Sequence, residues 1–220
     1  MRISSLLLIS VFVTLFTSSP SWADNNHLTT KKIAASAAQV SPLLNGQYIP
    51  ATVNVTTAEG KTLPLGKLLA DKKTILFFYR GGWCPFCNTQ MGQLKKIEMP
   101  LKKLGFQLIG ISTDSVEDLQ KSIGKHQLGY QLLSDFNSTA SQAFGLAYYS
   151  SQAVTDKYLS KMALKNPLQQ NPAGDKRLIL PVPAIYVIDS QGLVQFNYVN
   201  PNYKVRLHEA LLLKAAQLVK

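Results

Sequence analysis

Both cysteines of this 220-residue chain lie in one short segment, Cys84-Pro85-Phe86-Cys87. Two thiols three residues apart in the first turn of a helix place their α-carbons about 5 to 6 Å apart, a distance that a disulfide can bridge. Such a pair can cycle between dithiol and disulfide. The segment therefore predicts two-electron thiol chemistry.

Two other uses of a cysteine pair fit the sequence less well. A zinc site needs two more ligands, and the three histidines, His27, His126 and His208, are far apart and share no ligand spacing. A purely structural disulfide across so few residues restricts the unfolded chain little, and a chain of this length can bury a core without it. We therefore expect redox-active thiols, no metal and no organic cofactor.

The cysteines follow a predicted buried strand and begin a predicted helix. Residues 75–79 form a continuous apolar run, which is typical of a strand covered on both faces. Cys84 then takes the N-cap of the helix and Pro85 its first position, where proline's missing N–H costs nothing. Free N–H groups and the helix dipole stabilise a thiolate there, which favours Cys84 as the attacking nucleophile. Cys87 lies one turn deeper, where burial should keep it protonated until it acts as the resolving thiol.

Hydrophobic periodicity along the rest of the chain alternates strands with helices. It predicts strands at 52–56, 61–65, 107–111, 130–133, 184–188 and 193–199, and helices at 29–40, 91–104, 115–126, 138–144 and 202–219. This order predicts an α/β sheet with right-handed crossovers. Pro100 is expected to kink or split the helix that contains it.

The segment 150–180 differs from the rest because it is long and polar. Three residues that favour turns interrupt it: Pro167, Pro172 and Gly174. A loop of that length inside a compact domain is usually a functional insertion or lid, and the alternative is a solvated decoration. Helical spacing of three apolar residues predicts that part of it is a helix: Val154, Tyr158 and Met162.

The first residues have the pattern of a secretory signal peptide. Arg2 precedes an apolar run at 6–16, and Ser21-Trp22-Ala23 follows as a cleavage site of small residues. The run is too short to span a bilayer, and no later segment reaches the ~20 apolar residues of a membrane helix. We expect a signal peptide at 1–23, a polar, Ala-rich extension at 24–45 and one domain at 46–220, in a periplasmic or secreted protein. The alternative is an uncleaved N-terminal anchor.

Composition and charge exclude some functions. Hydrophobic residues make up 46% of the chain, which rules out disorder. The formal net charge of +11 falls to +10 without residues 1–23, because Arg2 is lost with them. This charge is mostly scattered lysine, and no basic run is interleaved with aromatic residues, so a solvated surface is favoured over nucleic-acid binding.

The segment Trp83-Cys84-Pro85-Phe86-Cys87 resembles the redox motif of thioredoxins and glutaredoxins. From about Gly46 to the C-terminus, the chain resembles the alkyl hydroperoxide reductase and thiol-specific antioxidant (AhpC/TSA) group, particularly a peroxiredoxin-like branch that carries C-x-x-C. The resemblance implies a thioredoxin-like fold, a single domain with a central mixed β-sheet flanked by helices. The segments that support it are 78–85, 111–114, 133–135, 180–189 and 199–203.

The resemblance also fails at informative positions. Peroxiredoxins support the reactive thiol with Pro-x-x-x-Thr-x-x-Cys, and counting back from Cys87 puts Cys84 at the Thr position and Arg80 at the Pro position. The arginine that peroxiredoxins carry before a later strand falls on Pro183. Thioredoxin-like enzymes have a cis-proline there, so the resemblance predicts a cis Val182–Pro183 bond facing Cys84, with an ordinary trans proline as the alternative.

The resemblance and the dithiol together predict an exported thiol-disulfide oxidoreductase that reduces or exchanges disulfides through Cys84 and Cys87. Expected substrate-binding residues are Trp83, Arg80, Val182 and Pro183, the backbone of Val182 holding a substrate disulfide or thiol. Arg80 is either a thiolate-stabilising group or a surface cation. One alternative is a thiol-dependent hydroperoxide reductase with Cys87 as the peroxidatic residue, and another is a non-catalytic binding module. Either enzyme needs a redox partner protein that donates or accepts electrons.

Overall fold

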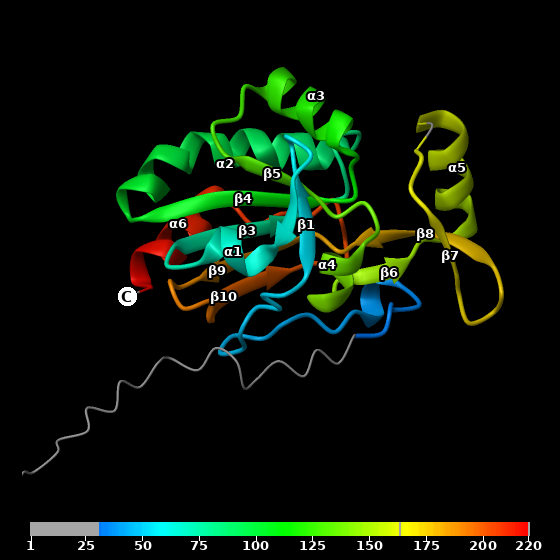
Figure 1. The fold of residues 1–220 in the computed structure, drawn as a ribbon, viewed down its shortest axis with the longest axis horizontal. Coiled ribbons are helices and arrows are strands. Elements are labelled where there is room, and N and C mark those ends of the chain that lie inside the picture. The colour runs from blue at the N-terminus through cyan, green and yellow to red at the C-terminus, as the bar shows by residue number, and fades with distance from the viewer. Residues whose placement is uncertain (1–30, 163, 220) are drawn as a thin grey trace, which may run out of the picture.

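The computed structural model describes residues 31–162 and 164–219, and the predicted signal peptide lies outside these ranges. A seven-stranded mixed sheet forms the centre, with strand order β10-β9-β3-β4-β5-β1-β2 (Figure 1). This is the mixed α/β fold, a central sheet flanked by helices, that the sequence predicted. The strands of this sheet are β1 (Asn54–Thr57), β2 (Thr62–Pro64), β3 (Lys73–Phe78), β4 (Phe106–Ser112), β5 (Gln131–Ser134), β9 (Ala184–Ile188) and β10 (Val194–Val199).

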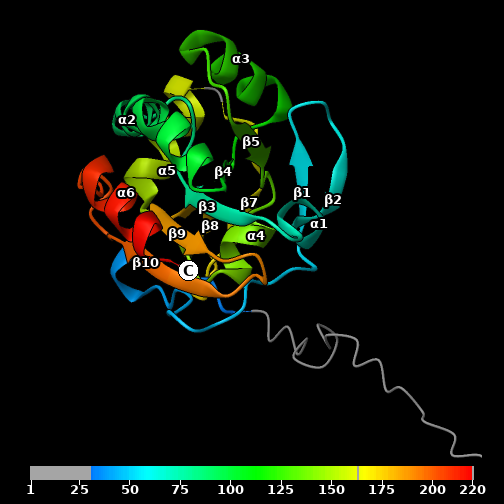
Figure 2. The same ribbon diagram turned by 90° about the vertical axis from the view of Figure 1, so that its left-hand side faces the viewer.

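Helices cover both faces of this sheet, as the view along the strands shows (Figure 2). On one face, α2, α3 and α6 pack on side chains such as Ile75 and Phe77 of β3. The alternate residues Leu76 and Phe78 face the other core, with α1, α4 and Phe144. The strand is therefore buried on both sides, as its continuous apolar run indicates. The helices are α1 (Leu65–Leu69), α2 (Pro85–Lys103), α3 (Val116–His126), α4 (Thr139–Ala143), α5 (Gln152–Met162) and α6 (Glu209–Leu218).

Strand register determines which loops meet at the end of β3. The parallel neighbour β4 aligns Ile111 with Phe78, and the antiparallel neighbour β9 aligns Ala184 with the same residue. The carboxyl ends of β3 and β4 therefore lie at one edge of the sheet, together with the start of β9. This edge brings the loop before Cys84, the loop after β4 and the Val182–Pro183 peptide close together.

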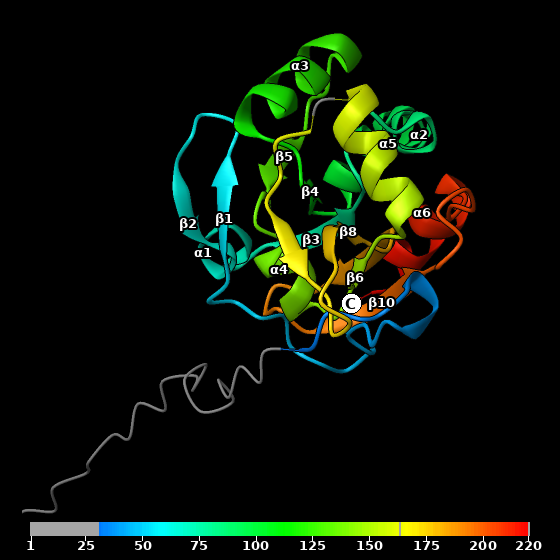
Figure 3. The same cartoon turned by 90° about the vertical axis from the view of Figure 1, so that its right-hand side faces the viewer.

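The segment 150–180 is a folded addition rather than a loop (Figure 3). Its helix α5 confirms the helical spacing seen in the sequence. Strands β7 (Leu168–Gln170) and β8 (Lys176–Pro181) join β6 (Ala147–Tyr149) in a separate three-stranded sheet. Tyr158 of α5 is buried against Leu178 and Leu180 of β8, so the addition has a small core of its own.

Three predicted helices differ in the structure. The one expected at 29–40 is only a 3₁₀ turn at Ala37–Gln39 within the described residues, and Ala34 instead bridges to Tyr148. Of the kink or split expected at Pro100, the split does not occur, because this proline lies in the last turn of α2, where it removes only one helical hydrogen bond. The last helix begins at Glu209 instead of near residue 202, since Asn200 and Asn202 accept local backbone hydrogen bonds that favour turns.

Candidate active site

The dithiol lies at the junction of β3 and α2. Cys84 is the N-cap of α2 with extended backbone angles, Pro85 follows at its start, and the backbone N–H groups of Cys87 and Asn88 both donate to the Cys84 carbonyl at 3.0 Å. This is the capping arrangement that the sequence predicted. Both cysteines are free thiols, with 1% of Cys84 and 0% of Cys87 exposed. The structure is therefore that of the reduced pair.

The two sulfur atoms have different acidities. Hydrogen bonding by the Cys87 thiol, then by its backbone N–H, and the charges of Arg80 and Arg206 together lower the pKa of Cys84 to about 6, against the opposing effect of burial. Burial, followed by the interaction with Cys84, raises the pKa of Cys87 well above its usual value. At neutral pH these shifts favour the thiolate at Cys84 and the neutral thiol at Cys87.

Arg80 is buried, with only 2% of the residue exposed, so it is not a surface cation. Its guanidinium lies 4.1 Å from the ring centroid of Tyr203, 5.1 Å from that of Trp83 and 5.4 Å from that of Tyr158, and its Nη2 donates to the Tyr158 hydroxyl at 2.8 Å. Among the described residues no carboxylate lies within 4.0 Å of it, and its buried Nε has no acceptor. The charge of Arg80 is one of the effects that lower the pKa of Cys84.

Three site residues were missed by sequence reasoning: Tyr158, Tyr203 and Arg206. Arg206 precedes α6, and its Nη2 donates to the Cys87 sulfur at 3.4 Å. Tyr203 and Tyr158 place their rings against Arg80, from the segment before α6 and from α5. The sequence did mark the segment before α6, because residues 199–203 resemble the AhpC/TSA family, although no role was assigned to Tyr203. No such signal marked Tyr158.

Aromatic pairs cover the dithiol region from two sides. Trp83 packs on Tyr158 with ring centroids 4.5 Å apart, and Phe86 packs on Tyr203 at 5.7 Å. The addition at 150–180 thus reaches the site through α5. Since both thiols are almost fully buried, a substrate oxygen reaches sulfur only after at least one covering side chain moves.

Asp114 fixes the loop that leads into the dithiol. Its Oδ2 accepts from the Gly82 N–H at 2.7 Å and from the Ser112 hydroxyl at 3.0 Å. Gly81 has φ +151°, and a Cβ there would overlap the Trp83 indole and Asp114 Oδ1, so the loop requires glycine at this position. Burial of Asp114 raises its pKa to about 6.

Asp114 is expected to make folding stability pH-dependent. Between its ordinary pKa and about 6, the folded protein keeps a proton that the unfolded chain has lost, so stability falls as pH rises through this window. Asp114→Asn keeps an acceptor for Gly82 but does not ionise. From pH 4 to pH 7, its free energy of unfolding should rise relative to wild type by up to about 3 kcal/mol, measured by urea denaturation.

Asp118→Asn is the matched control, because hydrogen bonding by Lys121 lowers the pKa of this half-exposed carboxylate. Asp118→Asn should lower the free energy of unfolding relative to wild type at pH values above the pKa of Asp118. This change is opposite in sign to the one expected for Asp114→Asn. A difference between Asp114→Asn and wild type that stays constant with pH would contradict the linkage.

The prediction of a cis Val182–Pro183 bond is wrong, because no peptide bond among the described residues is cis. Pro183 simply precedes β9, where a trans proline enters an extended strand without removing a ladder hydrogen bond. Val182 is fully buried, and its N–H already donates to the Leu146 carbonyl at 2.9 Å. That N–H is therefore not free to hold a substrate disulfide. The remaining predicted residues, Trp83 and Arg80, do lie beside the dithiol.

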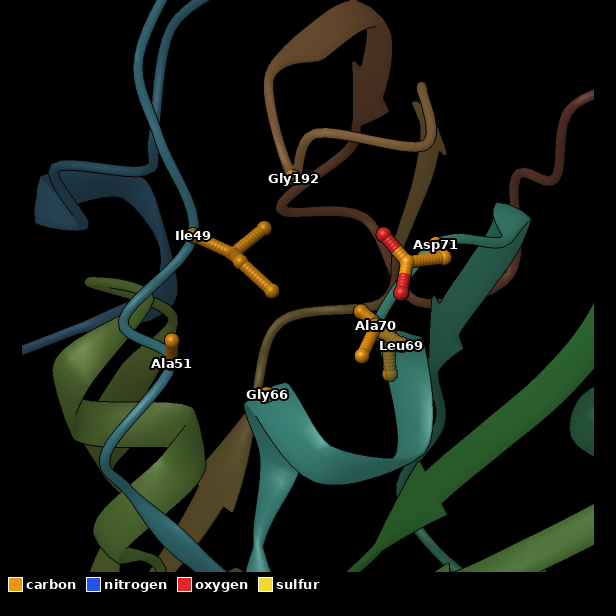
Figure 4. Close-up of a pocket in the computed structure, with 7 residues that line it drawn as sticks. All are labelled: Ile49, Ala51, Gly66, Leu69, Ala70, Asp71 and Gly192. Carbon is orange, nitrogen blue, oxygen red and sulfur yellow. The ribbon is translucent and has the colours of Figure 1, made fainter. Parts of the chain in front are cut away.

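A pocket of about 270 Å³ lies at the opposite end of β3, around α1 (Figure 4). Its lining is mainly apolar, with one carboxylate, Asp71, and holds neither cysteine. Across the described ranges we find no group of three or more His, Cys, Asp or Glu side chains able to hold a metal ion, and no helix that is both long and apolar enough to cross a membrane.

Comparison with known proteins agrees with this geometry. The AhpC/TSA family model matches residues 46–197. A putative peroxiredoxin bcp of Coxiella burnetii is 30% identical over 165 residues, which cover 75% of this chain and 93% of the relative. Peroxiredoxin Bcp of Escherichia coli is 33% identical over 107 residues, 49% of this chain and 67% of the relative.

Solved structures share the fold. Peroxidoxin BcpB of Mycobacterium tuberculosis superposes with a TM-score of 0.60 at 20% identity, covering 80% of this chain and 97% of that one. Reduced Prx3 of Vibrio vulnificus, solved in complex with H₂O₂, gives 0.63 at 16% identity, covering 79% and 99%. With the matched family model and the dithiol at the head of α2, these comparisons show that the chain belongs to the AhpC/TSA family and is a thiol-dependent oxidoreductase.

Proposed function

We propose that the protein is a thiol-dependent hydroperoxide reductase in which Cys84 attacks the peroxide and Cys87 resolves the product. The observation that carries this proposal is the pair of buried thiols one helical turn apart at the head of α2. Hydrogen bonding by Cys87 lowers the pKa of Cys84 to about 6, and burial raises the pKa of Cys87. The relatives named as peroxiredoxins support peroxide as the substrate. The predicted signal peptide at 1–23 supports a periplasmic or secreted enzyme.

The reaction has two steps on the protein. The Cys84 thiolate attacks one peroxide oxygen, an S–O bond forms as the O–O bond breaks, and the departing alkoxide or hydroxide takes up a proton. Cys87 sulfur then attacks the Cys84 sulfenic acid, so an S–S bond forms, the S–O bond breaks and water leaves with the Cys87 proton. The dithiol supplies two electrons to the peroxide. A thiol donor restores both cysteines by exchange and becomes a disulfide itself.

Arg80 has the geometry to assist the first step. Its buried guanidinium has no carboxylate partner among the described residues, so its charge acts on the Cys84 thiolate and on the oxygen that becomes negative as the O–O bond breaks. Trp83 packs beside it and directly precedes Cys84 in the chain. These two residues are the substrate-binding side chains that we retain from the sequence.

Two features favour a hydroperoxide over a protein disulfide. Both sulfur atoms are buried, so only a small oxidant reaches them after a side chain moves. The backbone of Val182 was expected to hold a substrate disulfide or thiol, and its N–H already donates to the Leu146 carbonyl. Attack by Cys87 instead of Cys84 is the alternative that the family register suggests, but burial raises the pKa of Cys87 and disfavours its thiolate.

The test uses the reduced chain without residues 1–23, with dithiothreitol as the thiol donor. We expect consumption of hydrogen peroxide and of cumene hydroperoxide, and formation of a Cys84–Cys87 disulfide that peptide mass spectrometry detects after a single turnover. In parallel, reduction of the insulin disulfides is expected to be no faster than with dithiothreitol alone. Rapid insulin reduction without peroxide consumption would replace the proposal by disulfide exchange.

A further inference from the structure

Arg206 lies against the second cysteine, and two of its three nitrogen atoms have no hydrogen-bond partner. Its Nη2 donates to the Cys87 sulfur, while Nε and Nη1 are buried without an acceptor. In the part of the chain that the structure describes, no carboxylate lies within 4.0 Å of this guanidinium. Burying donor groups of a charged side chain without partners is costly, so no stabilising ion pair accounts for its position.

The fold holds Arg206 in place through the segment 200–207, which connects β10 to α6. At its start, Asn200 N–H donates to the Pro183 carbonyl at 3.3 Å. In its middle, Tyr203 stacks on Arg80 at 4.1 Å. At its end, Leu207 is buried in the core that α2 and α6 share. Anchored at these three points, the segment presents Arg206 to Cys87 as a fixed group.

We propose that Arg206 is a catalytic residue of the resolving step: it stabilises the Cys87 sulfur as a thiolate while that sulfur attacks the sulfenic acid on Cys84. The inference rests on the proposed hydroperoxide chemistry and adds a residue to its second step. The step needs no further reactant, because the proton of Cys87 and the hydroxyl of the sulfenic acid leave together as water. The hydrogen bond to the reacting sulfur at 3.4 Å is the contact that carries it.

Oxidation of Cys84 increases the effect of Arg206 on the ionisation of Cys87. Before oxidation, burial, the hydrogen bond to Cys84 and the negative charge of Cys84 all raise the pKa of Cys87, whereas Arg206 lowers it. When Cys84 becomes a neutral sulfenic acid, its negative charge is gone. Burial still raises the pKa of Cys87, but the repulsion by the Cys84 thiolate no longer adds to it. The guanidinium of Arg206 therefore favours the Cys87 thiolate during the resolving step.

The two steps can be timed separately with one natural probe. Without residues 1–23 the chain keeps a single tryptophan, Trp83, directly before Cys84. In stopped-flow fluorescence of the reduced protein with hydrogen peroxide, the first phase should depend on peroxide concentration and the second should not. Arg206→Gln is expected to slow the second phase by roughly 10- to 100-fold, the value of a hydrogen bond to a charged group, and to leave the first within about threefold.

Three further measurements separate catalysis from structure. Arg206→Gln should accumulate Cys84 sulfenic acid that dimedone traps, and its second phase should need a higher pH than in wild type. Arg206→Lys should recover part of the rate because it keeps the charge. Arg177→Gln is the matched control, since this arginine is paired with Asp175 in the 150–180 addition, and it should leave both phases unchanged. Circular dichroism verifies that each variant is folded.

The outcomes distinguish the inference from the proposed function. A second phase in Arg206→Gln within threefold of wild type would overturn the role of Arg206 while peroxide reduction stands. Slowing of the first phase alone would also overturn it and would assign peroxide attack to Cys87. Absence of any peroxide-dependent phase in the wild-type protein would instead be a failure of the proposed function.

Discussion

Replacing Cys84 by Ser is expected to lower kcat/KM for hydroperoxides by at least about 10³-fold, because a serine hydroxyl is not ionised at neutral pH and cannot replace the thiolate. With a pKa of about 6, Cys84 is mostly thiolate at pH 7, whereas Cys87 stays protonated. The assay is peroxide consumption with dithiothreitol as the thiol donor. In the wild-type protein the rate should rise with pH through about 6 and then level off.

Cys87→Ser is the matched control for this variant. It keeps the attacking thiolate, so one equivalent of peroxide should still react and leave a Cys84 sulfenic acid that dimedone labels. The introduced hydroxyl keeps a donor for the Cys84 sulfur, and hydrogen bonding from this position is the largest cause of the lowered pKa of Cys84, so the attacking thiolate should persist. Peroxide turnover that survives Cys84→Ser but not Cys87→Ser would reverse the roles of the two cysteines.

The attacking half of this site can be predicted from sequence because its parts are contiguous. A buried apolar run, two glycines, a capping position and a proline at the helix start are local signals, and they place Cys84 and Cys87 correctly. The raised pKa of Cys87 follows from its depth, whereas the lowered pKa of Cys84 depends first on hydrogen bonding by Cys87 and then on the charges of Arg80 and Arg206. The local sequence does not reveal that Arg80 is buried. Its burial depends on the ring of Tyr158 from α5 and the ring of Tyr203 from the segment before α6.

The remaining parts of the site come from distant positions. Arg206 is 119 residues from Cys87, and Tyr158 is 78 residues from Arg80. Only the strand order and the path of the 150–180 addition bring them together, and hydrophobic periodicity carries no information on either. The prediction of a cis bond that presents the Val182 backbone to a substrate failed for a related reason. The position of Pro183 before β9 was right, but the Val182 N–H donates to Leu146 in the loop before β6, a contact that the local sequence does not reveal.

Fold prediction succeeded where burial alone decides the element. Strands β3, β4 and β9 are covered on both faces and were recognised by their apolar runs. It failed where side chains compete with the backbone: around Asn200 and Asn202, local hydrogen bonds replace a helical start. The sequence left the segment 150–180 open between a functional insertion or lid and a solvated decoration. Its strands β7 and β8 pair with each other and with β6, outside the central sheet, so the pattern of that sheet does not reveal them.

Replacing Arg80 by Met is expected to lower kcat/KM for hydroperoxides by roughly 10²- to 10³-fold at neutral pH, the usual effect of removing one group that stabilises charge in the transition state. The guanidinium is one of the groups that lower the pKa of Cys84, so this pKa should rise from about 6. The pH dependence of iodoacetamide alkylation of Cys84 reports that shift directly. Folding should not suffer, because Met packs well among Trp83, Tyr158 and Tyr203, and a buried cation without a carboxylate is removed.

Two companion variants identify which property of Arg80 matters. Arg80→Lys keeps the charge but loses the planar group that stacks on Tyr203, so it should retain the low pKa of Cys84 better than the peroxide rate. Tyr158→Phe removes only the acceptor of the Arg80 Nη2 hydrogen bond and should have a smaller effect than either change at Arg80. If Arg80→Met left both the alkylation midpoint and the peroxide rate within threefold of wild type, the buried guanidinium would have no part in the chemistry. A loss of rate with an unchanged pKa would place its action on the peroxide oxygen alone, because the thiolate would then form equally well without it.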